Sequence, residues 1–312
     1  MTCHLPARDQ LLQLPQRSFL CSQRSIQRVL LTTLTTLTTL VTAALLSACG
    51  GGGGGTAAAA PADVIRTLGC APNQSVALAS GGRLVNNTWN VAAVGNFAWS
   101  QCLLEKRSGS DVQYGWNWRW PDNGNQVYAY PEINIGAKPW ESGPGNDARF
   151  PRSLASTPRL LLDFDVDSSG TGSRNLAASF WFIRTPTVAS PPVESDIVAE
   201  LMVWADYTPD MVSNDGPATL RGEVTVDGRA WMVYAAEDWG AGAVTTQRWR
   251  FIVYLAKERT QKLNFDARKL MADAVARGLL PGDAFIANVE LGNELVSGSG
   301  TTFVRSFTVT TP

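Results

Sequence analysis

The sequence predicts an all-β domain in which many short strands form a sandwich or a closed barrel. Runs rich in Val, Trp, Tyr and Phe alternate with turn-forming clusters such as DNGN, DSSGTG, SNDGP and VDGR. Short strands separated by such turns are typical of sandwiches and barrels. The expected strands lie within residues 83–90, 114–120, 126–136, 159–166, 175–184, 199–207, 229–236 and 248–256. About 250 residues carry this pattern, which suits a single β-rich domain with a large core.

Residues 1–48 are expected to be a secretory signal. An uncharged, largely apolar stretch at 29–46 follows an arginine-bearing start and ends in Leu-Ser-Ala-Cys, before six glycines. An apolar region that ends in small residues is typical of a signal peptide. The ending resembles the bacterial lipoprotein box, in which Cys49 would be the lipidated N-terminus. The alternative is a transmembrane anchor, because about 18 residues just span a bilayer.

The glycine tract favours the lipoprotein, since it would make a flexible tether. We therefore expect a lipidated Cys and Gly/Ala-rich linker at 49–66 and the domain at 67–312. By resemblance to Gram-negative lipoproteins, Gly50 after Cys49 favours the outer membrane. The stretch before Arg24 is long for a signal peptide, which points to a translation start further downstream.

The cysteines indicate an oxidising compartment. Two of the five, Cys3 and Cys21, would leave with the leader, and Cys49 would be acylated. Cys70 and Cys102 remain as an even pair, for which a disulfide is expected. The alternative is two free buried thiols.

The residue inventory excludes several kinds of chemistry. The only histidine is His4, in the expected leader, so a Ser-His-Asp triad, a histidine-bound zinc and a histidine general base are unavailable to the domain. The net charge is −1, and no basic patch suggests nucleic acid. Any acid–base chemistry must therefore come mainly from carboxylates. The absence of a basic patch favours a neutral or weakly polar ligand. No metal or organic cofactor is expected.

One segment departs from the strand pattern. Residues 266–280, DARKLMADAVARGLL, place apolar side chains at helical spacing and reach Gly278, a residue that commonly follows a helix. We expect one helix, packed on the outside of the sheets.

A glutamate begins the apolar run ELMVW, 200–204. In a strand, Glu200, Met202 and Trp204 would share one face, while the residues between them face the core. A carboxylate beside an indole on a sheet face is suited to binding and cleaving sugars. The alternative is a glutamate at a strand edge with a salt-bridge partner.

A second glutamate, Glu294, lies in NVELGNELVSGSG, 288–300, which predicts a short strand followed by a Gly/Ser turn. Two carboxyl groups about 5–5.5 Å apart are what a retaining glycosidase requires. Glu290, on the same strand face, is the rival candidate for the second carboxyl group.

Together these motifs resemble glycoside hydrolase family 12, the compact endoglucanases and xyloglucanases. ELMVW and GNELVSGSG are similar to the two catalytic strands of that family. NNTWN between two cysteines, WNW at 116–118, VYAYPEINIG at 127–136 and RNLAASFWF at 174–182 follow in the family's order. The resemblance covers roughly 70–312. It implies a β-jelly-roll sandwich of two antiparallel sheets with a concave substrate groove and one packed α-helix.

The resemblance also implies roles for individual residues. Glu200 would be the nucleophile and Glu294 the acid/base. Four further residues would bind substrate: Trp89 as a stacking platform with Asn87 beside it, and Met202 and Trp204 flanking the reacting sugar.

The other tryptophans divide between groove and core. Trp118 would shape the groove, although core packing is equally expected for Trp116 and Trp118. Core packing is favoured for Trp181, Trp231 and Trp249.

The chain departs from the family at positions that bear on catalysis. Ser179 stands where the family has an aspartate hydrogen-bonded to the nucleophile, and Ala178 replaces the preceding tyrosine. A serine can donate a hydrogen bond to Glu200 but adds no charge that would separate the two pKa values. Asn293 in place of threonine is a conservative change.

We therefore expect a secreted, lipid-anchored, monomeric endo-β-1,4-glucanase that acts with retention. The alternative is a non-catalytic glycan-binding lipoprotein that uses the same aromatic residues. A polysaccharide lyase is disfavoured, because such enzymes usually need a His or a Tyr/Arg cluster. Groove width, set by loops 138–157 and 206–221, would decide between cellulose-like glucan, mixed-linkage glucan and xyloglucan.

Overall fold

The computed structural model describes residues 62–142, 145–212, 218–240 and 247–312, which belong to a compact unit at Ala58–Pro312. The expected signal, Cys49 and most of the linker lie outside these residues. The first strand begins at Val64, within the stretch expected to be the linker. No helix long and apolar enough to cross a membrane occurs in the described part of the chain.

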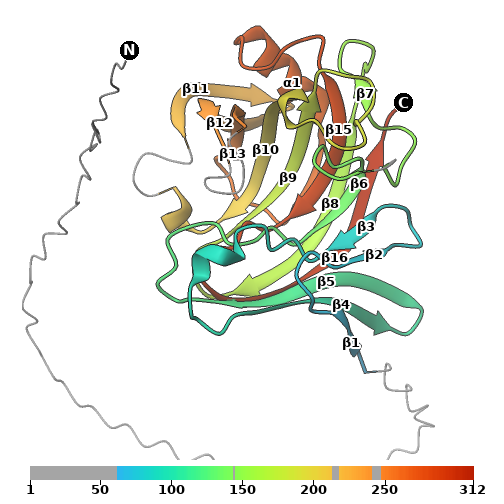
Figure 1. Cartoon of the computed structure of the whole chain (residues 1–312), viewed down its shortest axis with the longest axis vertical. Helices are drawn as coiled ribbons and strands as arrows, with labels where there is room; N and C mark the ends of the chain where they lie inside the picture. The colour runs from blue at the N-terminus through green and yellow to red at the C-terminus, as the bar shows by residue number, and fades with distance from the viewer. Residues whose placement is uncertain (1–61, 143–144, 213–217, 241–246) are drawn as a thin grey trace, which may run out of the picture. The chain divides into compact units, whose positions relative to one another are not determined.

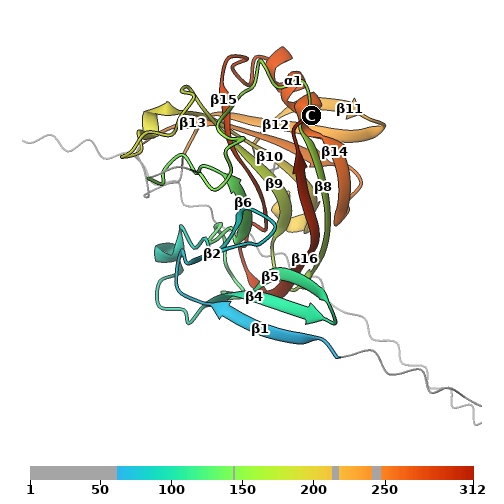
Figure 2. The ribbon, with the colours of Figure 1, turned by 90° about the vertical axis from the view of Figure 1, so that its right-hand side faces the viewer.

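Two β-sheets form the domain, which confirms the all-β prediction (Figures 1 and 2). The smaller sheet has the order β1 (Val64–Gly69), β4 (Ser100–Ser108), β5 (Asp111–Trp120), β16 (Gly298–Thr310), β8 (Leu161–Gly170) and β14 (Lys262–Asp266).

The larger sheet has the order β11 (Thr219–Val226), β12 (Arg229–Trp239), β13 (Trp249–Ala256), β10 (Ile197–Tyr207), β9 (Asn175–Ile183), β15 (Phe285–Gly292), β6 (Glu132–Gly136), β3 (Arg83–Val85) and β2 (Ser75–Ala77). The short β7 (Arg152–Ser153) pairs with β15. The expectation of wholly antiparallel sheets needs one correction, because β10 and β13 run parallel. Three 3₁₀ turns complete the chain: η1 (Val91–Val94), η2 (Glu194–Asp196) and η3 (Pro209–Met211).

The main core lies between the two sheets. In β8, Leu162, Phe164 and Val166 point inward and are at most 2% exposed, while the aspartates between them are more exposed. In β10, Leu201 and Val203 join the same core. Strand alternation then places Glu200, Met202 and Trp204 on the opposite side, which we call the outer face of the larger sheet.

The single α-helix of the described residues is α1 (Ala267–Ala276), within the predicted range. Asp266 caps its first turn by accepting a hydrogen bond from the Arg268 N–H at 3.2 Å. Ala267, Leu270, Met271 and Ala274 are its buried residues, as the spacing predicts. Gly278, two residues past the helix end, has a φ of 71°, which a glycine adopts without strain.

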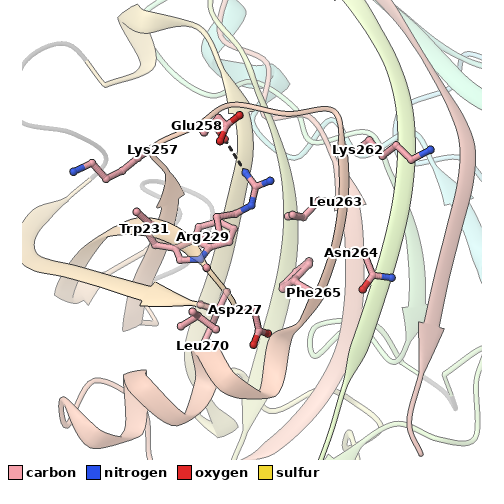
Figure 3. Close-up of a pocket in the computed structure, with 13 residues that line it drawn as sticks. Asp227, Arg229, Trp231, Lys257, Glu258, Lys262, Leu263, Asn264, Phe265 and Leu270 are labelled. Carbon is pink, nitrogen blue, oxygen red and sulfur yellow. Dashed lines mark hydrogen bonds between the residues drawn. The ribbon is translucent and has the colours of Figure 1, made fainter.

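A pocket of about 560 Å³ lies beside α1, between the β11–β12 turn and β14 (Figure 3). None of the predicted site residues lines it. The cations around it already have partners: Lys257 pairs with Glu223, Lys262 pairs with Asp165, and Arg229 donates to the carbonyl of Glu258.

The predicted disulfide between Cys70 and Cys102 is present and closes a loop of 32 residues next to β1 and β4. Such a cross-link stabilises mainly by restricting the unfolded chain, by about 3–4 kcal/mol for a loop of this length.

We expect the double variant Cys70→Ser/Cys102→Ser to unfold roughly 10 °C below the wild type in a thermal scan. Adding a reductant should lower the wild-type midpoint toward the same value and leave the variant unchanged. Equal midpoints for oxidised wild type and variant would show that the disulfide does not stabilise the domain.

Candidate active site

The candidate site lies on the outer face of four adjacent strands, β10, β9, β15 and β6. The strand register aligns side chains in rows across the sheet. One row contains Met202, Ser179, Glu290 and Asn134 on successive strands. The neighbouring row contains Glu200 opposite Trp181, with Phe251 of β13 on its other side.

Glu200 is half-buried on this face. Its Oε1 accepts a hydrogen bond from the Ser179 Oγ at 3.2 Å. The serine therefore gives Glu200 the donor that the sequence led us to expect. Met202 and Trp204 share the face, but at 2% exposure each they are packed into it and do not project from it.

Glu294 lies between β15 and β16, two residues beyond the end of β15. The expectation that it lies within a strand was therefore wrong. Asn175, at the start of β9, holds it from two sides: its Nδ2 donates to the Glu294 Oε2, and its Oδ1 accepts from the Glu294 N–H at 2.8 Å. Sequence reasoning did not select Asn175, because only the fold brings it to Glu294.

The neighbouring Asn293 anchors this segment to the core. Its Oδ1 accepts hydrogen bonds from the Trp116 Nε1 at 3.0 Å and the Thr302 Oγ1 at 2.8 Å. Its Nδ2 donates to the Asn175 carbonyl at 2.5 Å. These bonds hold the backbone that carries Glu294 in one position.

Burial changes the proton affinity of both carboxyl groups. It raises the pKa of Glu294 to about 7, against a smaller lowering by the Asn175 hydrogen bond. It also raises the pKa of Glu200 well above its usual value, with repulsion from Glu294 and Glu290 adding to the effect and hydrogen bonds from Ser179 and Trp249 opposing it. Both carboxyl groups therefore bind a proton more tightly than an exposed glutamate does. Glu294, with a pKa of about 7, can keep a proton to donate as a general acid.

Glu290, the rival for the second carboxyl group, is placed differently. It is 2% exposed, pairs with the Lys138 Nζ at 3.2 Å and accepts a hydrogen bond from Asn288 at 2.8 Å. A carboxylate enclosed in this way cannot reach a glycosidic oxygen, so the geometry favours Glu294.

Tyr130 is a further residue of the site that sequence reasoning missed. Its hydroxyl donates to the Ala177 carbonyl of β9 at 2.9 Å. Burial, followed by the negative charges of Glu290, Glu132, Glu294 and Glu200, raises the pKa of Tyr130 well above its usual value. The phenol therefore stays protonated at working pH, among four carboxyl groups.

A tryptophan expected in the groove lies in the core, and others expected in the core lie on the outer face. Trp118 is 3% exposed and belongs to the core between the sheets, as does Trp116, so the groove role expected for Trp118 is wrong. Trp231 is in the core as expected. Trp181 and Trp249 are buried, but they form a separate cluster on the outer face beside Glu200.

Two exposed indoles extend this aromatic surface. Trp140 is 38% exposed and meets Trp181 edge-on, with ring centroids 4.3 Å apart. Trp239 is 39% exposed and stacks on Phe251 at 4.8 Å. Since Trp181 and Phe251 flank Glu200 in the register, aromatic rings lie on both sides of it. No local sequence pattern distinguished Trp140 and Trp239 from the other tryptophans.

The predicted sugar-binding residues Asn87 and Trp89 lie in the turn after β3. The Asn87 carbonyl accepts a hydrogen bond from the Tyr130 N–H at 2.9 Å, which joins this turn to the site. Trp89 is half-buried. Within the described residues, no cluster of three or more His, Cys, Asp or Glu could hold a metal ion.

Comparisons with known proteins agree with this geometry. The model of glycosyl hydrolase family 12 matches residues 83–311. A curated relative, Endoglucanase S from Pectobacterium parmentieri, is 26% identical over 222 residues, covering 70% of this chain and 76% of the relative.

Solved structures of the same family share the jelly-roll fold. The native family 12 xyloglucanase from Bacillus licheniformis is 25% identical with a TM-score of 0.67, over 80% of this chain and 100% of that one. Endoglucanase cel12A from Rhodothermus marinus is 23% identical with a TM-score of 0.59, over 80% and 98% of the two chains.

The raised pKa of Glu294 predicts a pH-dependent cost in stability. The folded protein holds a proton on Glu294 that the unfolded chain releases above pH 4.5, so this group's contribution to stability falls as the pH rises from about 4.5 through 7. We expect Glu294→Gln to gain roughly 6–10 °C in unfolding midpoint relative to the wild type between pH 4.5 and pH 8.

The control for this experiment is Glu258→Gln, which changes an exposed glutamate beside the remote pocket. Its difference from the wild type should be the same at both pH values. A Glu294→Gln difference that is equally independent of pH would contradict the predicted titration.

Proposed function

Because the chain belongs to glycosyl hydrolase family 12, we propose that it is an endo-acting β-1,4-glucanase that hydrolyses its substrate with retention. The relatives are named as an endoglucanase and a xyloglucanase, which supports a β-glucan substrate. The observation that carries the proposal is the pair Glu200 and Glu294, two half-buried carboxyl groups whose pKa values are both raised by burial.

Retention requires one carboxylate and one carboxylic acid. In the proposed mechanism, ionised Glu200 attacks the anomeric carbon and forms a glycosyl-enzyme, while Glu294 protonates the departing oxygen. Glu294 then takes a proton from the water that releases the sugar. The Ser179 hydroxyl holds the Glu200 Oε1, which orients the carboxylate for attack.

The positions of the two glutamates suggest how the polysaccharide lies. Glu200 is opposite Trp181 near one end of β9, whereas Glu294 contacts Asn175 at the other end. A glucan that passes between them would cross the strands. The exposed rings of Trp140 and Trp239 would then lie beside the chain and could stack on sugar faces.

The alternative of a non-catalytic glycan-binding protein is not favoured. It was motivated by Ser179 in place of an aspartate, yet Ser179 still donates to Glu200. Glu200 and Glu294 are also both present, and burial raises the pKa of each.

We further propose that the enzyme acts outside the cytoplasm as a lipid-anchored monomer. The Cys70–Cys102 disulfide supports an oxidising compartment. The apolar stretch at 29–46 and Cys49 support a lipoprotein signal, and the Gly/Ala-rich linker would tether the domain to the outer membrane.

We expect Glu200→Gln to lower the release of reducing ends by at least about 10³-fold, since no glycosyl-enzyme can form. The assay should cover carboxymethylcellulose, mixed-linkage glucan and xyloglucan, which would also identify the preferred substrate. Cellohexaose should still bind the variant within a few-fold of the wild-type Kd by calorimetry.

Glu258→Gln serves as the matched control and should hydrolyse the glucans at the wild-type rate. Near-normal turnover by Glu200→Gln would rule out its assignment as nucleophile. Tight binding by the wild type without any release of reducing ends would instead establish the glycan-binding alternative.

The lipid anchor predicts that cells expressing the full chain incorporate radiolabelled palmitate into it and retain it in the membrane fraction. Cys49→Ser should lose the label and leave the membrane. A Cys49→Ser protein that stays in the membrane would indicate a transmembrane anchor at 29–46.

A further inference from the structure

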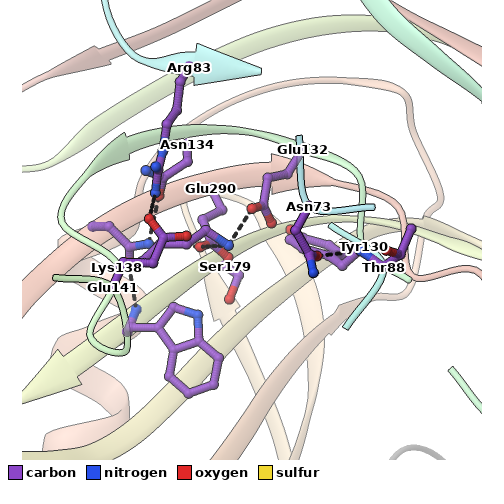
Figure 4. Close-up of polar contacts among 12 residues, drawn as sticks. Asn73, Arg83, Thr88, Tyr130, Glu132, Asn134, Lys138, Glu141, Ser179 and Glu290 are labelled. Carbon is purple, nitrogen blue, oxygen red and sulfur yellow. Dashed lines mark hydrogen bonds and ion pairs between the residues drawn. The ribbon is translucent and has the colours of Figure 1, made fainter. Parts of the chain in front are cut away.

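A buried cation lies beneath the outer face, close to the catalytic pair. Lys138, just after β6, is 3% exposed and pairs with both Glu132 and Glu290 (Figure 4). The two glutamates are 0% and 2% exposed. Charges removed from water in this way cost free energy even when they are paired. The proposed hydrolysis mechanism uses none of the three, so their presence requires another explanation.

Glu290 is fixed in position by two donors. The Lys138 Nζ lies 3.2 Å from its Oε1, and the Asn288 Nδ2 donates to the same atom at 2.8 Å. Asn288 is itself held, because its Nδ2 also donates to the Asn134 Oδ1 at 2.8 Å. The carboxylate therefore cannot rotate freely, and its charge has a defined place.

Glu290 lies one strand away from Ser179, the residue that contacts Glu200. Glu290 of β15 is directly opposite Ser179 of β9, and Ser179 donates to the Glu200 Oε1 at 3.2 Å. Side chains directly opposite in a sheet have their Cβ atoms about 4.5–5.5 Å apart. Figure 4 shows Glu290 and Ser179 side by side, with Lys138 beyond Glu290.

We propose that Glu290, held by Lys138 and Asn288, is a positioning residue of the catalytic pair whose fixed negative charge, acting across Ser179, sets the pH range in which Glu200 is ionised. The expected effect on hydrolysis rests on the proposed function, whereas the expected effect on the titration of Glu200 does not. The Lys138 Nζ, 3.2 Å from the Glu290 Oε1, places a positive charge against this carboxylate and stabilises its negative charge.

The charged groups around Glu200 agree with this role. After burial, the negative charges of Glu294 and then Glu290 raise the pKa of Glu200 most. Glu294 comes from the segment after β15. The two strands that pair with β10 place no charged side chain directly opposite Glu200 or Met202. β9 contributes Ser179 and Trp181, and β13 contributes Phe251 and Val253.

Glu132, on β6, completes the network at a greater distance from Glu200. Burial and then repulsion from Glu290 raise the pKa of Glu132 to about 8, against the pull of Lys138 and a hydrogen bond from Asn87. Lys138 contacts both carboxyl groups, but only Glu290 lies directly opposite Ser179. Further out, Arg83 pairs with Glu141, whose charge also acts on Lys138. Tyr130, the remaining titratable group of the site, stays neutral.

The test is the titration of Glu200 in the folded protein, followed by NMR of ¹³C-labelled glutamate carboxyl groups and assigned with Glu200→Gln. Glu290→Gln keeps the size of the side chain and an oxygen that can accept from Asn288, but it removes the charge. We expect the pKa of Glu200 to fall by about 0.5–1 unit. The acidic limb of the kcat/KM profile should move to lower pH by the same amount, because Glu200 then remains ionised in more acidic solution.

The matched control is Glu132→Gln, which removes an equally buried partner of the same lysine that is not opposite Ser179. It should move the acidic limb by no more than about 0.2 pH unit. A role for Glu290 in packing alone predicts the same result for both variants, so equal shifts, or none, would overturn the proposal.

A new carboxylate at position 179 gives an independent test, in which Glu290→Gln is used only as part of a double variant. Ser179→Asp places a second carboxylate opposite Glu290 and should raise the acidic limb. The double variant Ser179→Asp/Glu290→Gln should return it toward the wild-type position. Failure of the double variant to compensate, with Glu200 titrating normally in both proteins, would contradict the proposal.

The two hypotheses fail in distinguishable ways. A wild type that releases no reducing ends would refute the proposed hydrolase, while the NMR titration would still decide the role of Glu290. A hydrolase whose Glu200 titration ignores Glu290 would keep the proposed function and refute only this inference.

Discussion

The removal of carboxyl groups from water on one face of the larger sheet is the constraint on which the site depends. Desolvation favours the protonated form of a carboxyl group. Here it raises the pKa of both Glu200 and Glu294. Hydrogen bonds from Ser179 to Glu200 and from Asn175 to Glu294 oppose that effect. The chemistry of the site is a consequence of this balance.

The two-sheet architecture makes such a balance possible. β9 and β10 fill the core with one face, through residues such as Phe180, Leu201 and Val203, and carry aromatic clusters beside polar side chains on the other. Their outer face is free to carry Ser179 and Glu200 in a fixed register. Because a slip of one residue would exchange the two faces, the hydrophobic core itself holds the catalytic side chains in place.

Ser179 illustrates how a missing group can be supplied by another strand. The sequence comparison led us to expect a carboxylate at this position, and the serine supplies only a hydrogen bond. A carboxylate does lie directly across the ladder, at Glu290, where it pairs with Lys138. The negative charge and the hydrogen-bond donor near Glu200 thus come from two residues instead of one.

The sequence by itself determined the all-β class, the helix near the C-terminus, the disulfide and the shared face of Glu200, Met202 and Trp204, because each depends on local spacing or composition. It could not place Trp181 and Trp249, since a tryptophan buried on the outer face has the same local pattern as one in the core between the sheets. It also could not pair Lys138 with Glu290, or Asn175 with Glu294, which lie more than a hundred residues apart in the chain. Only the tertiary structure decided these contacts, because strand order and register, set by the packing of the whole domain, determine which distant side chains meet.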